Sequence, residues 1–436
     1  MHNTHVISQK ILIFAASTPN MLKGMDRHLR FSLLLAFLSV VLGVQAQVVV
    51  SGIVTDRDSR SPLSHVSVTA GGTDIHTVTN DDGRFTLKLS QRPAYLLLTH
   101  IGYNPRRYEL KGDDTSSLRI PMTGTTVRLD EVVISADDPR DIVEAAMARL
   151  EQNYPRQPEL ARCFYRETAR RGSRFISVAE AVIDMYKSSY AFGPERDAVA
   201  ILKGRRLMSM KSSDTLGVKM QGGPVLPLMV DVAKNREYLL NADCLPFYTY
   251  RQELSVRLND RLHYVISMTP SQATAFPLIG GLLYIDRETL TITRAELELD
   301  CTDRQRASAY MLVRKPFTLR FRPRELKVVV AYQTDTLGIT RMAYVRNELR
   351  FHCDWKRRLF SNAYTLESEM VVTDRLAAGK DVKRPRGRSS FGIHERFYDR
   401  VEYFNDPLFW ADYNIIEPSE RLENAISKLK KKVTRP

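Results

Sequence analysis

The sequence predicts a mostly β protein: an N-terminal β-sandwich, a short helical linker, and a larger antiparallel β domain with a C-terminal helix. Short runs of alternating apolar and polar residues, separated by turns, recur from 48 to 122 and again from 163 to 374. Helix-start signals stand at Asp138-Pro139 and at Pro418. Because consecutive strands follow a single helix, we expect the larger sheet to curve as a half-barrel.

Residues 1–46 are expected to be a signal peptide. Arg27 and Arg30 precede the apolar run 31–43, and residues 44–46 supply the small or short side chains of a cleavage site. The run is shorter than the roughly 20 apolar residues that span a bilayer, so cleavage after Ala46 is preferred over a retained anchor. We therefore expect an exported protein of the periplasm or the outer membrane.

The charge of the chain bears on its partners. The formal charge is +14, and residues 1–46 contain four basic residues and one aspartate, so their removal leaves +11. A basic protein outside the cytoplasm meets anionic lipid and acidic glycan. An envelope protein, glycan or lipid is therefore the expected partner, with an anionic lipid surface as one candidate, and nucleic acid is not.

The four cysteines leave two alternatives open. They are Cys163, Cys244, Cys301 and Cys353. Export permits two disulfides, and buried free thiols are the other alternative. None of the four belongs to a C-x-x-C pair, so no metal or redox motif is indicated.

Residues 47–123 are predicted to form the sandwich. Its strands are expected at 49–55, 66–69, 77–79, 84–89 and 95–100. Asn80-Asp81-Asp82-Gly83 predicts a hairpin turn, because Gly accepts the positive φ that such a turn requires. The acidic residues of this turn lack the ligand spacing of an EF-hand, so the turn interpretation is preferred over a calcium loop.

Three strings in this region resemble the carboxypeptidase-regulatory-like domain, a transthyretin-like sandwich found at the start of many Gram-negative envelope proteins. They are SGIVTDRDSRSPLSHVSV (51–68), TVTNDDGRFTL (77–87) and LLLTHIGYNPRRYEL (96–110). The resemblance covers about a fifth of the chain. It implies an accessory domain without an active site.

Residues 124–160 are expected to be a linker and a helix. The string TTVRLDEVVISADDP (125–139) is similar to the segment that follows the same domain in TonB-dependent receptors. The residues that remain are too few for the rest of such a receptor. Asp138 is the expected helix cap, with Pro139 at the first helical position and the helix running to about Asn153.

Residues 161–436 are predicted to be the β-rich domain with an aromatic C-terminal segment and a helix. Strands are expected at 262–268, 282–286, 290–300, 326–333, 342–351 and 366–373, with a strand or short helix at 175–185. The strings at 164–190, 282–299 and 409–426 are similar to an uncharacterised group of envelope proteins. Leu422, Ile426 and Leu429 share one face of the last helix.

Motifs for catalysis are missing from the sequence. No His has a Glu three residues later to hold zinc. His-Glu-x-x-His, Gly-x-Ser-x-Gly and a phosphate-binding glycine loop are also missing. We therefore assign no catalytic, cofactor-binding or metal-binding residue and expect neither an enzyme nor a cofactor.

Two groups of residues carry competing interpretations. The first comprises Arg166, Glu167, Arg170, Glu180 and Asp184; paired acids suit acid–base chemistry, but an exposed lattice of ion pairs is preferred. The second comprises Phe397, Tyr398, Tyr403, Phe404, Phe409, Trp410 and Tyr413. A tail whose aromatics dock onto the β domain is preferred over a sugar-stacking platform.

A non-enzymatic binding or assembly protein of the bacterial cell envelope is the preferred function. An accessory role in TonB-linked uptake, suggested by the segment 129–133, is the alternative, and a hydrolase without a recognisable motif is the second. Two basic segments, 380–388 and 428–435, either keep the protein in solution or dock it to anionic lipid. The first lies in the stretch 377–390, which is rich in Gly and Pro and predicts a mobile loop.

Overall fold

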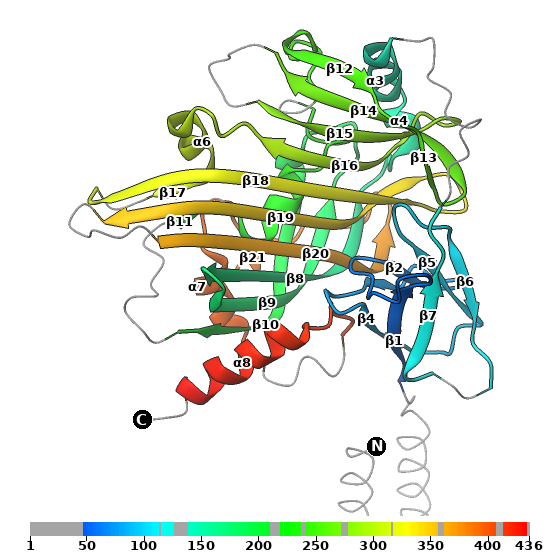
Figure 1. Cartoon of the computed structure of the whole chain (residues 1–436), viewed down its shortest axis with the longest axis horizontal. Coiled ribbons are helices and arrows are strands. Elements are labelled where there is room, and N and C mark those ends of the chain that lie inside the picture. The colour runs from blue at the N-terminus through cyan, green and yellow to red at the C-terminus, as the bar shows by residue number, and fades with distance from the viewer. Residues whose placement is uncertain are drawn as a thin grey trace, which may run out of the picture. The chain divides into compact units, whose positions relative to one another are not determined.

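Two small sheets and one large antiparallel sheet make up most of the structure (Figure 1). The computed structural model describes residues 47–112, 115–125, 138–209, 219–220, 222–236, 240–271, 278–314, 317–355, 362–406 and 413–433. The mostly β fold class is confirmed. The predicted signal peptide lies outside the described residues. Within them, no helix combines the length and the apolar character needed to cross a bilayer.

The N-terminal sandwich consists of a three-stranded and a four-stranded sheet. Its strands are β1 (Val48–Asp56), β2 (Ser67–Ala70), β3 (His76–Val78), β4 (Arg84–Leu89), β5 (Tyr95–Thr99), β6 (Arg106–Glu109) and β7 (Leu118–Met122). The strand orders are β4-β1-β7 and β3-β2-β5-β6. Alternate residues of both sheets are buried, as in β4, where Phe85, Leu87 and Leu89 point inward, so the period-2 pattern of the sequence defines this core.

The turn at residues 80–83 differs from the predicted hairpin. β3 pairs with β2, whereas β4 belongs to the other sheet beside β1, so the turn crosses between the two sheets. The Asn80 side chain fixes it by accepting from the backbone N–H groups of Asp82 and Arg84, both at 2.9 Å. Gly83 has φ +71°, so the requirement for Gly holds although the strand pairing does not.

The helical linker follows the prediction closely. Asp138 caps α3 (Pro139–Ala148) by accepting from Arg140 N at 2.9 Å, and Pro139 stands in the first turn. A second short helix, α4 (Leu150–Asn153), continues the segment. Ile142, Val143 and Ala146 of α3 are buried, which places one face of the helix in the main core.

The large sheet has 12 strands, all paired antiparallel. Its order is β12-β14-β15-β16-β18-β19-β20-β8-β9-β10-β21, and β13 pairs with β14. The strands are β8 (Glu159–Arg171), β9 (Arg174–Lys187), β10 (Ala198–Met208), β12 (Tyr248–Gln252), β13 (Val256–Leu258), β14 (Arg261–Pro270), β15 (Ile279–Asp286), β16 (Ile292–Leu299), β18 (Leu319–Thr334), β19 (Thr340–Trp355), β20 (Asn362–Ala378) and β21 (Ser390–Phe391). The segment predicted as strand or helix at 175–185 is a strand.

Shorter elements complete the described part of the chain. A separate pair of strands is formed by β11 (Lys219–Met220) and β17 (Leu312–Arg314). The remaining helices are η2 (Pro194–Arg196), η4 (Gly223–Val225), α5 (Leu226–Met229), η5 (Leu245–Phe247), α6 (Arg304–Met311), α7 (Phe397–Val401), η6 (Glu402–Phe404) and α8 (Glu420–Val433). The last helix begins two residues after the predicted Pro418.

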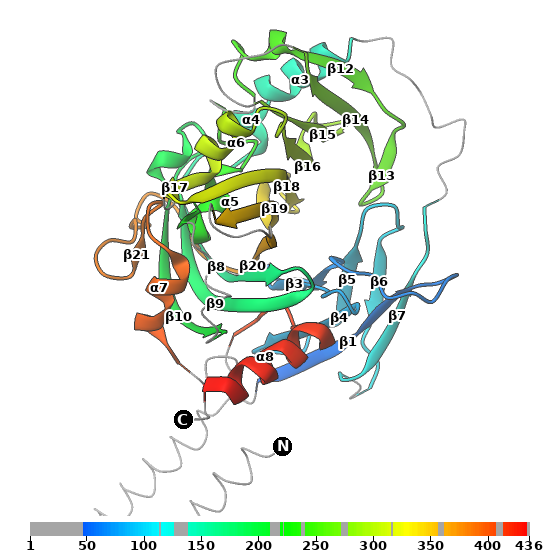
Figure 2. The ribbon, with the colours of Figure 1, turned by 60° about the vertical axis from the view of Figure 1, so that its left-hand side comes forward.

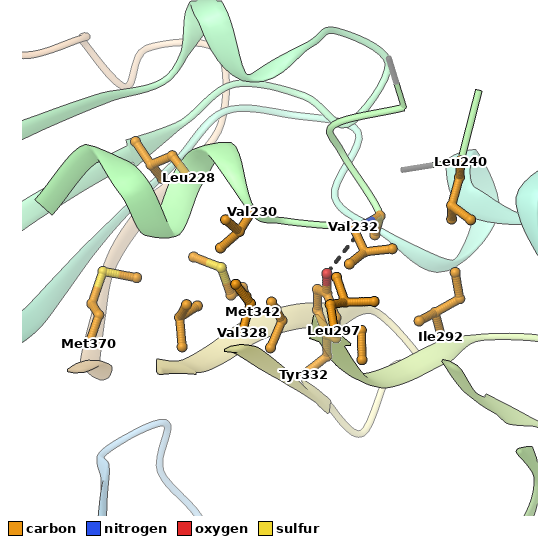
Figure 3. Packing of buried hydrophobic residues seen from close by; sticks show 14 of the residues in the cluster. Leu228, Val230, Val232, Leu240, Ile292, Leu297, Val328, Tyr332, Met342 and Met370 are labelled. Atoms are coloured by element: carbon orange, nitrogen blue, oxygen red, sulfur yellow. Dashed lines mark hydrogen bonds between the residues drawn. The ribbon is translucent and has the colours of Figure 1, made fainter. Parts of the chain in front are cut away.

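One face of the large sheet carries the main hydrophobic core. Leu228, Val230, Val232 and Leu240 lie on sheet residues such as Ile292, Val328 and Met370 (Figure 3). α3 and α7 add to the same cluster, which also contains Ile201 from β10 and Met268 from β14. Strands near both edges thus share one core, as a curved open sheet requires. Leu228, Val230, Val232 and Leu240 thus cover part of this face.

The other face of the sheet is covered by the sandwich, residues 413–418 and α8. Val78 of β3 packs with Phe164 of β8 and Ile416. α8 lies beside β9 and β10 (Figure 2). Leu422, Ile426 and Leu429, which were predicted to share one face of this helix, are buried and pack on Val178 of β9.

Candidate functional site

Arginine and glutamate side chains from neighbouring strands meet on the face of the large sheet that the sandwich covers. Arg166 of β8 stands opposite Glu180 of β9, and its Nε donates to Glu180 Oε1 at 2.7 Å. Arg205 of β10 donates to Glu180 Oε2 at 2.7 Å. Arg166 is 4% and Glu180 0% exposed. The predicted ion pairs are present, but the expectation that they are exposed is wrong.

Burial of this ion pair has a tertiary cause. Arg166 also donates to the carbonyl of Ile416 at 2.6 Å, and residues 414–418 run between the sheet and the sandwich. Asn414 exchanges hydrogen bonds with the backbone of Lys88 in β4, at 2.7 and 3.0 Å. Polar residues alternate with apolar residues along β8, and this pattern is typical of a sheet with one face in solvent. The expectation of exposure failed because residues 414–418, which are far away in the sequence, cover that face.

The charged network continues onto β19 and β20. Glu369 lies 3.5 Å from His65 of the sandwich, and Arg346 pairs with Glu367 at 2.6 Å. Burial raises the pKa of Glu369, but the hydrogen bond and charge of His65, with Arg166 and Arg346, outweigh it and hold that pKa below its ordinary value. The network therefore places His65 of the sandwich against Glu369 and Arg346 of the large sheet.

Of the other members of the first group, Arg170 joins this network through Glu367, whereas Glu167 and Asp184 have other partners. Glu167 lies on the opposite face, where Tyr165 donates to it at 3.2 Å and burial raises its pKa. Asp184 pairs with Arg162 at 2.9 Å, and Arg170 with Glu367 at 3.4 Å. Glu180 and Asp184 are each paired with arginine, and these ion pairs connect neighbouring strands.

A second buried cluster escaped the sequence analysis. It lies between β9, the residues before β10, and residues 230–234, and consists of Lys187, Tyr190, Asp197, Asp231, Lys234 and Tyr332. Lys187 pairs with Asp231, and Lys234 pairs with Asp197 at 2.6 Å. The only local signal is a lysine at the end of each apolar run, in VIDMYK (182–187) and LMVDVAK (228–234).

The two lysines of this cluster differ in setting. Tyr190 and Tyr332 donate to Asp231 at 2.9 and 2.7 Å, so this carboxylate has three donors. Burial, followed by the neighbouring charge of Lys187, lowers the pKa of Lys234 to about 8. The cluster is enclosed on all sides by the chain, so it ties residues 230–234 to the sheet.

The aromatic group divides between core and surface. Phe397 is buried and meets Tyr165 edge-on at 4.9 Å, and Tyr398 and Phe404 pack against the main core. Tyr403 is 68% exposed. The docked-tail interpretation thus holds for most of the described members, while Phe409 and Trp410 lie outside the described residues.

The cysteines are free thiols. Cys163, Cys244 and Cys353 are buried and Cys301 is partly buried, and burial raises the pKa of all four thiols. The structure thus favours the thiol alternative over disulfides. Across the described ranges, no three His, Cys, Asp or Glu side chains are grouped to hold a metal ion.

The basic segment at 380–388 has fixed points in the structure. Gly379 N donates to Pro158 O at 2.9 Å, and Arg384 donates to the carbonyl of Asp197 at 3.1 Å. β21 follows directly and pairs with β10. Its other basic side chains are exposed, namely those of Lys380, Lys383, Arg386 and Arg388. Whether this loop is mobile stays a prediction.

A hollow of about 600 Å³ lies where α8 meets the β8–β9 turn and the sandwich. Arg174, Arg421 and Lys428 line it together with Asp82 and Glu420. Arg421 closes one side by donating to Ser173 O at 2.9 Å. Lys428, near the basic C-terminal end of α8, therefore lies at the edge of a polar hollow.

Comparison with known proteins identifies the N-terminal domain. Residues 50–134 match the family described as CarboxypepD_reg-like domain, which confirms the resemblance noted in the sequence. No curated protein matches the chain.

Parts of the chain are similar to several solved structures. A DUF1329 family protein from Desulfovibrio piger is 14% identical over 56% of this chain and 95% of that chain, with a TM-score of 0.23. A domain described as an outer membrane lipoprotein-sorting protein from Vibrio parahaemolyticus is 10% identical over 56% and 94%, with a TM-score of 0.26. A LolA superfamily protein from Nitrosomonas europaea is 12% identical over 53% and 94%, with a TM-score of 0.20. At TM-scores this low, the similarity carries no conclusion about ligand or activity.

Proposed function

We propose that the protein is a non-enzymatic binding or assembly protein of the bacterial cell envelope, exported to the periplasm or outer membrane and docked to anionic lipid. One observation carries the docking proposal. Lys380, Lys383, Arg386 and Arg388 are exposed on a segment that also holds Arg384, and Asp381 is its one acidic residue. Each basic residue near an anionic surface contributes about 1 kcal/mol.

The anchored geometry of this segment supports the proposal. Its start is bonded to Pro158 and its end continues into β21, so its charges are presented together at little cost in chain entropy. The C-terminal end of α8, where Lys428 and Lys430 are exposed, adds basic charge. The segment 129–133, on which the TonB-linked alternative depends, lies outside the described residues.

The test is co-sedimentation of residues 47–436 with phosphatidylglycerol vesicles across a salt series. The variant Lys380→Gln/Lys383→Gln/Arg386→Gln is expected to lower the partition coefficient by roughly 100-fold at low salt, since about 3 kcal/mol is lost. Binding of the unaltered protein is expected to fall as salt rises, because salt screens the attraction.

A matched control removes the same charge elsewhere. Arg57, Arg92 and Arg119 are exposed on the sandwich, and their replacement by Gln is expected to leave sedimentation within about twofold of the unaltered protein. Equal sedimentation of the segment variant and the unaltered protein at every salt concentration would show that the segment only keeps the protein in solution.

A further inference from the structure

A polar pocket of about 500 Å³ lies between the end of the basic segment and α7. It is lined by Arg388, His394, Glu395, Arg396, Asp399, Arg400 and Tyr403. Arg388, His394, Arg396 and Tyr403 are exposed, so the pocket is open to solvent. It is separate from the buried charge networks and from the hollow beside α8.

The walls of this pocket are fixed to the large sheet. Phe397 and Val401 of α7 are buried in the main core. Arg400 donates to the carbonyls of Arg388 and Ser390, at 2.6 and 3.0 Å. These contacts tie the two sides of the pocket together, so the backbone that carries the lining side chains is held in place before any ligand arrives.

The electrostatics of the pocket favour an anion. Glu395 pairs with Arg400 at 3.1 Å, and Asp399 with Arg396 at 3.6 Å. Among the described residues, Arg388 pairs with no carboxylate, so one positive charge of the lining is left over. A guanidinium group offers two parallel N–H donors, which match the two oxygens of a carboxylate.

The rim of the pocket adds an aromatic ring. Tyr403 is 68% exposed, whereas Phe397 of the same aromatic group is 3% exposed. An exposed ring beside guanidinium groups suits a ligand with an apolar flat face and an attached anion. An acyl chain would need an apolar lining, and Tyr403 is the one apolar surface among seven lining residues.

We propose that this pocket binds an acidic sugar unit of an envelope glycan. Arg388 and Arg396 pair with the sugar carboxylate, and Tyr403 stacks on the C–H face of the sugar ring. The site goes beyond the lipid docking proposed above, because a soluble saccharide tests it in the absence of any vesicle.

Isothermal titration of residues 47–436 with trigalacturonate is the direct test, with cellotriose as the neutral probe. Trigalacturonate is expected to bind and cellotriose to show no heat of binding. Arg388→Gln and Tyr403→Ala are each expected to weaken binding by about tenfold or more, because the first removes one of the two guanidinium groups that pair with the carboxylate and the second removes the ring that stacks on the sugar. Both side chains are exposed, so circular dichroism is expected to be unchanged.

Matched controls test whether the loss of any nearby arginine or any exposed aromatic ring would weaken binding equally. Arg386 lies two residues from Arg388 but does not line the pocket, and Phe192 is an aromatic residue 43% exposed with Arg196 over its ring at 3.7 Å. Arg386→Gln and Phe192→Ala are expected to stay within about twofold of the unaltered affinity.

Three results would overturn the proposal. Absence of trigalacturonate binding removes it directly. Full competition by inorganic sulfate together with unchanged binding by Tyr403→Ala reduces the pocket to a simple anion site. Loss of phosphatidylglycerol vesicle binding in Tyr403→Ala, without any trigalacturonate binding by the unaltered protein, assigns the pocket to the membrane.

Discussion

The turn between the two sheets of the sandwich requires glycine at position 83. Its φ is +71°, and a Cβ there would lie 2.5 Å from Val54 O and 3.1 Å from Leu63 N. Gly102 has a similar φ of +78° with nothing within 4 Å of a Cβ. A substitution at Gly102 therefore tests backbone strain alone, whereas a substitution at Gly83 tests strain together with collision against the neighbouring strand.

Gly83→Val is expected to lower the free energy of unfolding by about 3 kcal/mol, and Gly102→Val by about 1 kcal/mol. A β-branched residue at positive φ is strained at both sites, but only at Gly83 must β1 also move. Urea unfolding of residues 47–436 measures both values. Equal losses would mean that strain alone acts and that the contact with Val54 relaxes freely.

At the scale of the element, β8, β9 and β10 are joined by one buried carboxylate. Glu180 accepts from Arg166 and Arg205, both at 2.7 Å. Glu180→Gln leaves two guanidinium groups without their shared anion, so a loss of about 3 kcal/mol is expected. Glu144→Gln is the control, because Glu144 pairs with Arg140 at 2.8 Å on an exposed helix face and its loss is expected to stay within about 0.5 kcal/mol.

The outcome is read from urea unfolding of both variants. If Glu180→Gln lowered the free energy of unfolding by less than about 1 kcal/mol, the ion pairs of Glu180 would behave as surface ion pairs do. That result would contradict their burial. Glu180→Leu combined with Arg166→Met and Arg205→Met is expected to cost less than Glu180→Gln alone, because it removes the carboxylate together with both arginines that donate to it.

Elements with a strong local pattern were predictable, and those defined by distant contacts were not. The apolar face of α8 and the helix cap at Asp138 depend only on residues close together in the sequence, so both were predicted correctly. β18, β19 and β20 extend well beyond the predicted ranges, because charged residues at their ends, such as Arg320, hide the alternation. The burial of Arg166 and Lys234 depends on segments hundreds or dozens of residues away, which no local pattern encodes.

At the scale of the molecule, residues 414–420 join the sandwich to the sheet. Thr77 donates to Ile415 O at 3.1 Å and Asn80 to Pro418 O at 3.2 Å, from the sandwich side. Arg166 contacts Ile416 O from the sheet side at 2.6 Å. Both parts contact the same short segment, so the segment couples their unfolding.

Truncation after Tyr413 is therefore expected to split thermal unfolding into two transitions, with the sandwich melting separately from the large sheet. The untruncated chain from residue 47 is expected to unfold in one transition, because residues 49–436 pack as one unit. Truncation after Ser419 is the control, since it removes α8 but keeps residues 414–418, and it is expected to lower the melting temperature while leaving one transition. Differential scanning calorimetry measures all three. A single transition after truncation at Tyr413 would show that the direct contacts of Val78 and His65 with the sheet couple the two parts without the segment.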